Sequence, residues 1–97
     1  MPAYISLLNF TDQGIRNVKQ TTQRAEAFRA TAEKMGVKVK EIYWTLGRYD
    51  AVADIEAQDD EAVTRLMLSL GSLGNVRTET LRAFSAQEMD RILRGMP

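Results

Sequence analysis

The chain contains no cysteine and no histidine. Without cysteine it has no disulfide, no thiolate nucleophile, no iron–sulfur ligand and no cysteine-type zinc site. Without histidine it lacks the usual general base, the commonest transition-metal ligand and the usual haem axial ligand. A Ser-His-Asp triad cannot form within such a chain. Any catalysis would therefore depend on carboxylates, tyrosine, lysine, arginine or a borrowed cofactor.

An excess of one charge and a long apolar run are missing as well. Thirteen basic and thirteen acidic residues give a net charge of zero, so no overall field attracts a nucleic acid or a membrane surface. No run approaches the roughly 18 apolar residues of a membrane span. The apolar residues 1–10 lack the basic flank and cleavage site of a signal peptide. We therefore expect a cytoplasmic protein that binds neither nucleic acid nor membrane.

The hydrophobic pattern predicts one α+β domain over residues 1–97. Four strands are expected, at residues 3–10, 37–46, 49–57 and 75–84. Three helices are expected: residues 14–35 after a Thr11 cap, a second from the acidic residues 59–61 to Gly71 or Gly74, and a terminal helix opened by a capping box at residues 85–88. Gly36 should end the first helix, and Gly47-Arg48 should form a two-residue hairpin turn.

This order, β-α-β-β-α-β with a C-terminal helix, predicts a ferredoxin-like fold. Right-handed crossovers through the two long helices give a four-stranded antiparallel sheet with both helices on one face. The other face of the sheet would be open. An open apolar face commonly pairs with a second copy, so the fold class itself leads us to expect a homodimer or higher oligomer.

Residues 44–50, Trp-Thr-Leu-Gly-Arg-Tyr-Asp, resemble the Gly-x-Tyr-Asp signature of the GYD-domain family. Residues 9–15, 68–78 and 80–85 are also similar to that family, so the resemblance covers essentially the whole chain. It implies a ferredoxin-like fold of the dimeric α/β-barrel type, in a family of uncharacterised function. Related barrels include haem-degrading monooxygenases, cofactor-free oxygenases and lactone isomerases, but one fold hosts many functions. The absence of histidine disfavours the haem branch.

Tyr49 and Asp50 are the candidate catalytic residues. Asp50 would act as a general base and Tyr49 as a proton donor at the mouth of a cavity, provided that Asp50 is partly buried. In the structural alternative, Tyr49 packs against Leu46 or Trp44 and Asp50 bonds the amides of the turn.

Trp44, Tyr43 and Arg82 are the candidate ligand-binding residues. Alternation along the second strand places Tyr43 and Trp44 on opposite sides, with Val37 and Val39 beside Tyr43. One of the two aromatic residues should therefore face a partner or a ligand, since a small domain seldom leaves such side chains in water. Arg82 could hold a substrate carboxylate with two hydrogen bonds, or it could form ion pairs between subunits.

Two further interpretations compete with simpler ones. Asp50, Asp54 and Glu56 share one side of the third predicted strand and could bind Mg²⁺ or Mn²⁺, but a solvated face is simpler, and we expect neither metal nor cofactor. Exposed aromatic residues on a four-stranded sheet can bind RNA. Here the last strand reads Arg-Thr-Glu-Thr and the chain is neutral, which disfavours RNA.

The expectation is thus a homo-oligomeric domain that binds a small molecule or serves assembly. The alternative is a cofactor-independent dimeric-barrel enzyme, an oxygenase or isomerase that acts on a small aromatic or ketone substrate. The sequence leaves both open.

Overall fold

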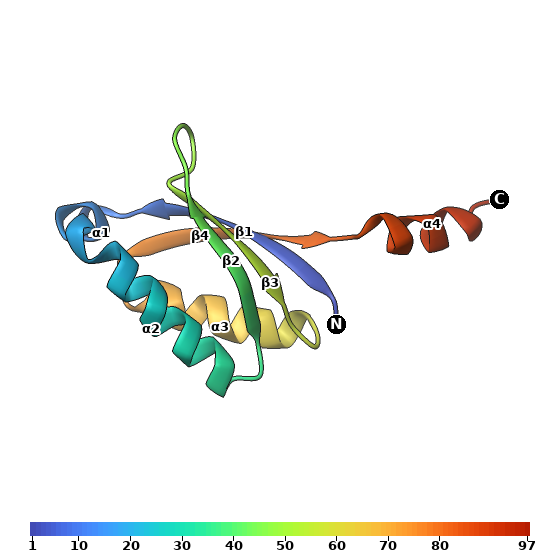
Figure 1. Ribbon diagram of the computed structural model, residues 1–97, viewed down its shortest axis with the longest axis horizontal. Coiled ribbons are helices and arrows are strands. Elements are labelled where there is room, and N and C mark those ends of the chain that lie inside the picture. Colours follow the sequence, from blue (N-terminus) through green and yellow to red (C-terminus); the bar gives the residue numbers. More distant parts are fainter.

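The computed structural model describes residues 1–97 and confirms the ferredoxin-like order of elements. The strands are β1 (Ala3–Phe10), β2 (Lys38–Trp44), β3 (Ala51–Glu56) and β4 (Val76–Ala83). The helices are α1 (Asp12–Arg16), the short 3₁₀ helix η1 (Val18–Gln20), α2 (Thr21–Lys34), α3 (Asp60–Ser72) and α4 (Ala86–Arg94). All strand pairs are antiparallel, in the order β2-β3-β1-β4. Helices α2 and α3 lie on the same side of this sheet (Figure 1).

The core lies between the sheet and these two helices. Ile55 of β3 and Leu66 of α3 are fully buried, and Phe28 of α2 and Tyr4 of β1 pack into the same cluster. Burial alternates along β3 and along the first half of β1, as expected for a sheet with one covered face. Only 15 of the 97 residues are buried although 44% are hydrophobic, so much apolar surface stays accessible to a partner.

The first predicted helix is interrupted, contrary to the expectation of one helix over residues 14–35. Thr11 caps α1 as predicted, since its hydroxyl accepts the Gly14 N–H. Helix α1 ends at Arg16 with Asn17 as its C-cap, and side chains donate to carbonyl groups around the break. Asn17 donates to the Gln13 carbonyl, and Arg24 donates to the carbonyls of Asn17 and Gly14. These side-chain bonds stabilise the break between α1 and α2.

The hairpin between β2 and β3 is also longer than predicted. Residues 45–50 form the loop, and it is closed by a hydrogen bond from the Thr45 N–H to the Asp50 carbonyl, 2.9 Å. Gly47 has φ of +114°, a conformation that favours glycine, but the predicted two-residue turn is wrong. The Thr45 hydroxyl donates to the Tyr49 carbonyl over 2.6 Å and holds the wider loop together.

An irregularity at Lys40 changes the sides on which the β2 residues lie. The register with β3 shifts between Val39 and Glu41, as in a β-bulge. Consequently Val39, Ile42 and Trp44 share the helix-covered side, whereas strict alternation had placed Val39 with Tyr43. Tyr43 lies on the open side.

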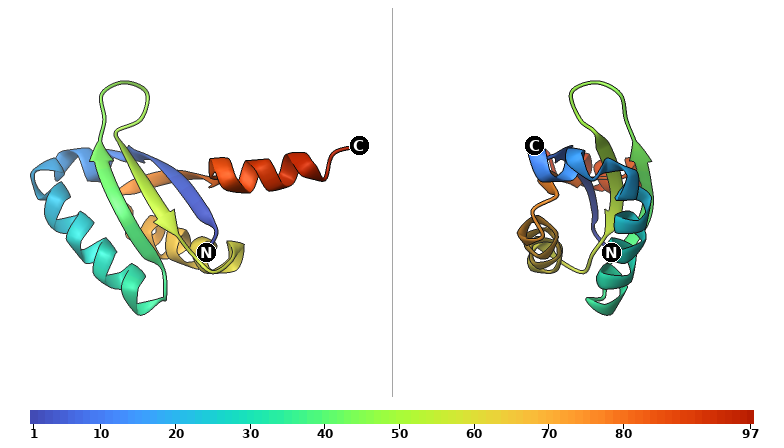
Figure 2. Two further views of the ribbon diagram at one scale, coloured as in Figure 1. Left: turned by 45° about the vertical axis from the view of Figure 1, so that its right-hand side comes forward. Right: turned by 90° about the vertical axis from the view of Figure 1, so that its left-hand side faces the viewer.

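Helix α4 projects away from the rest of the molecule (Figure 2). The Ser85–Glu88 capping box is confirmed, with both reciprocal hydrogen bonds present. None of the α4 residues is buried, and the chain is 51 Å long in its longest dimension. The apolar side of this helix therefore has no partner within the chain. No helix is both long enough and apolar enough to cross a membrane.

Candidate functional site

A cleft of about 340 Å³ opens between α2, α3 and the covered face of the sheet. Leu8 and Phe10 of β1 and Ala51 and Ala53 of β3 line it from the sheet. Its walls include Phe28 of α2 and Leu70 of α3. Most lining residues are hydrophobic, and a largely apolar concavity with few polar groups is the usual form of a small-molecule site.

Small side chains on the helices leave this space unfilled. Ala25, Ala27 and Thr31 of α2 line the cleft, and Ser69 lies on its α3 side. Larger residues at these positions would close the gap between helix and sheet, since protein interiors otherwise pack without large voids.

Asp50 lines the cleft, and the backbone around it is held firmly. Its carboxylate Oδ2 accepts the Phe10 N–H over 2.8 Å. Its own N–H donates to the Leu8 carbonyl over 2.9 Å, and its carbonyl accepts from Thr45. The hydrogen bond to a backbone amide agrees with the structural alternative, although the amide belongs to β1 and not to the turn. Oδ1 of Asp50 forms no hydrogen bond within the chain, so one carboxylate oxygen remains available.

Trp44 lies at the rim of the same cleft. Its indole N–H donates to the Thr21 hydroxyl over 3.0 Å, and 44% of the residue is exposed. The hydrogen bond fixes the indole against the start of α2. The ring is thus available for apolar contact while its polar group is already satisfied.

Tyr49 and Tyr43 do not join this cleft. The Tyr49 hydroxyl donates to a carboxylate oxygen of Glu79, 3.5 Å away, and Glu79 lies on the open side of β4 opposite Leu7. Tyr43 is 60% exposed on the open side of β2. Although Tyr49 and Asp50 are adjacent in the chain, the Tyr49 hydroxyl and the Asp50 carboxylate bond different strands and do not meet at one site. The catalytic roles of these two residues stay predictions.

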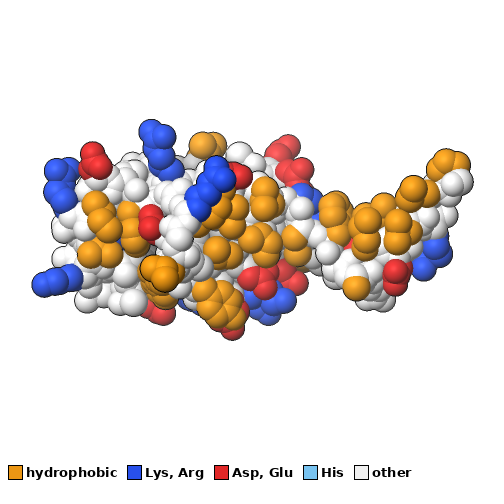
Figure 3. Space-filling model, turned by 90° about the horizontal axis from the view of Figure 1, so that it is seen from above, with side chains coloured by type: hydrophobic (Ala, Val, Ile, Leu, Met, Phe, Trp, Pro, Cys, Tyr) orange, Lys and Arg blue, Asp and Glu red, His pale blue; other side chains and the backbone are white.

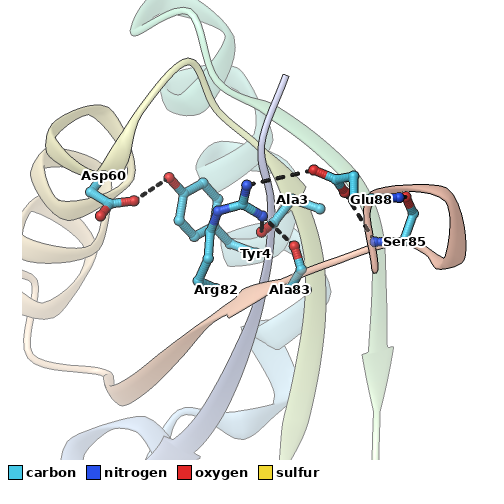
Figure 4. Close-up of polar contacts among 7 residues, drawn as sticks. All are labelled: Ala3, Tyr4, Asp60, Arg82, Ala83, Ser85 and Glu88. Atoms are coloured by element: carbon cyan, nitrogen blue, oxygen red, sulfur yellow. Dashed lines mark hydrogen bonds and ion pairs between the residues drawn. The ribbon is translucent and has the colours of Figure 1, made fainter. Parts of the chain in front are cut away.

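Arg82 is likewise absent from the lining of the cleft, and it ties α4 to the sheet (Figure 4). Its guanidinium carbon is 4.5 Å from the centre of the Phe84 ring and 5.6 Å from that of Tyr4. The guanidinium donates to the carbonyls of Ala3 and Ala83 and pairs with Glu88, 3.6 Å away. With these contacts formed, Arg82 serves as an anchor for α4, and the predicted role in holding a ligand is not required to explain it.

Tyr4 and Glu88, on either side of Arg82, have shifted pKa values. Burial, followed by the 2.6 Å hydrogen bond to Asp60, raises the pKa of Tyr4 to about 12. The hydrogen bond that the Glu88 carboxylate accepts from the Ser85 backbone N–H is the main reason that the pKa of Glu88 is lowered. Tyr4 is therefore held protonated, and Glu88 is held as the carboxylate that caps α4.

The carboxylates of β3 do not assemble a metal site. Asp54 and Glu56 lie on the open side of the sheet, whereas Asp50 lines the cleft. No group of three or more acidic residues is placed to hold a metal ion. The three-carboxylate interpretation of the sequence is thus not supported by the geometry.

The open face of the sheet carries the second candidate surface. Ile5, Leu7, Val52 and Leu81 lie on this face, and Leu81 is 45% exposed. Figure 3 shows hydrophobic side chains gathered over the sheet and continuing along one side of the projecting α4. We call residues 84–97, which include α4, the arm; its exposed large apolar residues are Phe84, Met89, Ile92, Leu93 and Met96.

A family model for the GYD domain matches residues 4–93. The chain belongs to the GYD-domain family. The predicted family is thereby confirmed, and the match includes strands β2 to β4, all of β1 except Ala3, and most of α4.

Known relatives of this GYD domain share nearly its whole length. It is 37% identical over 90 residues to a Thermus thermophilus protein named glutamine synthetase and cystathionine beta-lyase binding protein, covering 92% of this chain and 95% of the relative. A crystal structure from Thermus thermophilus is similar with a TM-score of 0.58 and 28% identity, covering 89% and 96% of the two chains. The crystal structure of a protein named as an FFRP shares the fold, with a TM-score of 0.61, 21% identity and coverage of 87% and 100%.

The signature of this GYD domain lies at the β2–β3 loop, where the two surfaces meet. Gly47 allows the loop conformation, Asp50 bonds β1 beside the cleft, and Tyr49 reaches Glu79 on the open side. Sequence reasoning selected these residues but missed Thr21 and the small residues of α2. The many alanine and threonine residues of α2 could have indicated this part of the cleft, because small side chains are typical of a helix that packs loosely against its sheet.

Proposed function

We propose that this GYD domain is a homodimeric binding protein. Two copies join through the open sheet face and α4, and the dimer binds other proteins. The observation that carries this proposal is the continuity of the apolar surface from the sheet onto the arm (Figure 3). Residues 1–97 act as one domain in this proposal, because Arg82 anchors the arm to β1.

The charges on the open face support pairing with a second copy. Asp54 and Glu56 lie on β3, an inner strand with Lys38 of the edge strand β2 opposite Glu56, and Arg77 lies on the other edge strand, β4. The two ion pairs of the chain are Arg65–Glu61 and Arg82–Glu88, so none of these face charges is paired internally. A two-fold arrangement can place the carboxylates of β3 in one copy beside Arg77 of the other.

The size of the face suits a stable interface. Figure 3 views the open side over the longest and shortest axes, along which the whole chain measures 51 Å and 18 Å. A standard interface buries roughly 800 Å² per partner, so the proposed interface includes both the sheet face and the arm. The arm is essential to this extent, since the sheet alone is shorter.

The binding of other proteins is proposed from the relative. That protein's name states that it binds two enzymes, glutamine synthetase and cystathionine beta-lyase. A binding role also agrees with the separation of Tyr49 from Asp50. The alternative of a cofactor-independent oxygenase or isomerase needs the proposed acid, Tyr49, and the proposed base, Asp50, at one place, and of these two only Asp50 lines the cleft.

The test is the mass in solution of two matched variants, measured by light scattering at micromolar concentration. Leu81→Glu places a charge in the proposed interface. Leu68→Glu makes the same change on α3, away from it, where the residue is 68% exposed. We expect twice the chain mass of 10.9 kDa for the natural protein and for Leu68→Glu, and 10.9 kDa for Leu81→Glu. A dimer that survives Leu81→Glu, or a natural protein that is monomeric, contradicts the proposal.

A further inference from the structure

We propose that the cleft between α2, α3 and the sheet binds a small apolar molecule that carries one protonated amine. In this complex the ammonium group bonds Oδ1 of Asp50, and the apolar body lies between Phe28 and the ring of Trp44. This site lies on the side of the sheet opposite the proposed dimer interface, so it is a binding function beyond the one proposed above.

The form of the cleft suits a molecule of this kind. Its volume of about 340 Å³ lies at the lower end of the range for small-molecule sites, roughly 300 to 1,000 Å³. The apolar lining of Leu8, Phe10 and Leu70 favours a hydrocarbon or aromatic body. An occupant would also cover apolar core residues that the loosely packed helices leave accessible.

The charge at the cleft selects the polar group of the ligand. Asp50 and Arg24 are the charged residues of its lining. The guanidinium of Arg24 is engaged with the carbonyls of Asn17, 2.7 Å away, and Gly14, 3.3 Å away. It forms no ion pair with Asp50. The carboxylate of Asp50 thus has no cationic partner within the chain, and an ammonium group supplies one.

The position of Asp50 is fixed before any ligand arrives. One carboxylate oxygen accepts the Phe10 N–H, and the backbone on both sides of the residue bonds Leu8 and Thr45. The free oxygen is therefore held in place at little cost in conformational entropy when a ligand binds. Trp44 is similarly fixed through Thr21, and its ring face also attracts a cation.

The experiment uses three probes with the same hydrocarbon body: 4-phenylbutylamine, 4-phenylbutanol and 4-phenylbutyrate. Trp44 is the single tryptophan of the chain, so quenching or enhancement of its fluorescence reports occupancy directly. We expect the amine to bind about tenfold or more tightly than the alcohol, from the strength of a charge-assisted hydrogen bond. The butyrate should bind most weakly.

Matched variants separate the site from general effects. Asp50→Asn keeps an oxygen for the Phe10 N–H but removes the charge, and it should abolish the preference for the amine. Glu33→Gln removes the same charge from an exposed position of α2 outside the lining and should leave the preference intact. Ala25→Leu fills the cleft and should weaken all three probes, whereas Ala30→Leu, on an exposed part of α2 outside the lining, should not.

Three results would overturn the proposal: no binding of the amine at millimolar concentration, tighter binding of the butyrate, or an amine preference that persists in Asp50→Asn. Circular dichroism of Asp50→Asn checks that the variant is folded. The dimer mass should be the same for Asp50→Asn and the natural protein. Failure at the cleft is thereby distinguished from failure of the proposed dimer.

Discussion

Replacement of Arg82 by methionine should loosen α4 from the sheet and destabilise the fold. Methionine keeps an unbranched apolar stem but removes the guanidinium that contacts Tyr4, Phe84 and Glu88. The variant also leaves the Ala3 carbonyl without the donor that lies 3.2 Å from it. The guanidinium of the natural protein thus connects the first strand and the last strand with the start of the arm.

The magnitude follows from the separate interactions of this guanidinium. Each cation–π contact contributes about 0.5 to 1 kcal/mol at accessible sites, and Arg82 has two. A hydrogen bond from a charged group contributes roughly 1.5 to 3 kcal/mol net, and the lower end applies because Arg82 is exposed. All of them share one side chain, whose ordering costs entropy, so we expect the free energy of unfolding to fall by about 2 kcal/mol.

The assay is urea unfolding at one fixed protein concentration, because self-association makes stability depend on concentration. Arg65→Met is the matched control. Its guanidinium forms a single ion pair with Glu61, 3.8 Å away, at side chains that are 65% and 86% exposed, so the destabilisation should be small. Hydrogen exchange should also quicken in residues 86–94 of Arg82→Met. Equal stability of the two variants would show that Arg82 is not the anchor of α4.

Three further predictions concern single side chains. The pKa of Tyr4, raised from 10.0 to about 12, contributes stability that is complete below pH 10 and is lost as the pH rises through 12. In urea unfolding, Tyr4→Phe should therefore lose less unfolding free energy between pH 10 and pH 12 than the natural protein does. The same pH dependence in both proteins would argue against a buried, hydrogen-bonded hydroxyl. Gly14→Ala would place a Cβ 1.9 Å from the Asn75 carbonyl oxygen and should lower the unfolding free energy by about 1 to 3 kcal/mol. Gly71→Ala is the control: the space around this residue of α3 is open, so the change should be neutral or stabilising. Equal effects of the two substitutions would contradict the close packing of Gly14. The pKa of Glu88 is lowered from 4.5, so its carboxylate stabilises α4 above pH 4.5 and ceases to do so as the pH falls through the folded-state pKa. Glu88→Gln should therefore make hydrogen exchange in α4 less dependent on pH in the acid range. A pH dependence equal to that of the natural protein would count against the capping role.

Local signals in the sequence were sufficient for most of the fold. Thr11, Gly36 and the Ser85–Glu88 capping box act on neighbouring residues, and the structure confirms each of them. The alternation in β1 and β3 likewise follows from local pattern and a single covered face. These features need no knowledge of distant contacts.

Features that depend on distant residues were not predicted. The bulge at Lys40 changes which residues of β2 share a side, and it is a property of the pairing with β3. The adjacent residues Tyr49 and Asp50 separate because their partners, Glu79 and Phe10, lie on different strands. Arg82 likewise acquires its role only when residues from the two ends of the chain meet.

The pairing of two copies through the open sheet face can be tested by cross-linking. The chain has no cysteine, so Leu7→Cys introduces a single thiol near the middle of that face, and Leu68→Cys introduces one on α3 as the control. With a short bismaleimide at micromolar protein, we expect a linked product of twice 10.9 kDa for Leu7→Cys only. A linked product of equal yield from both variants, or none from Leu7→Cys, would mean that the copies do not meet at this face.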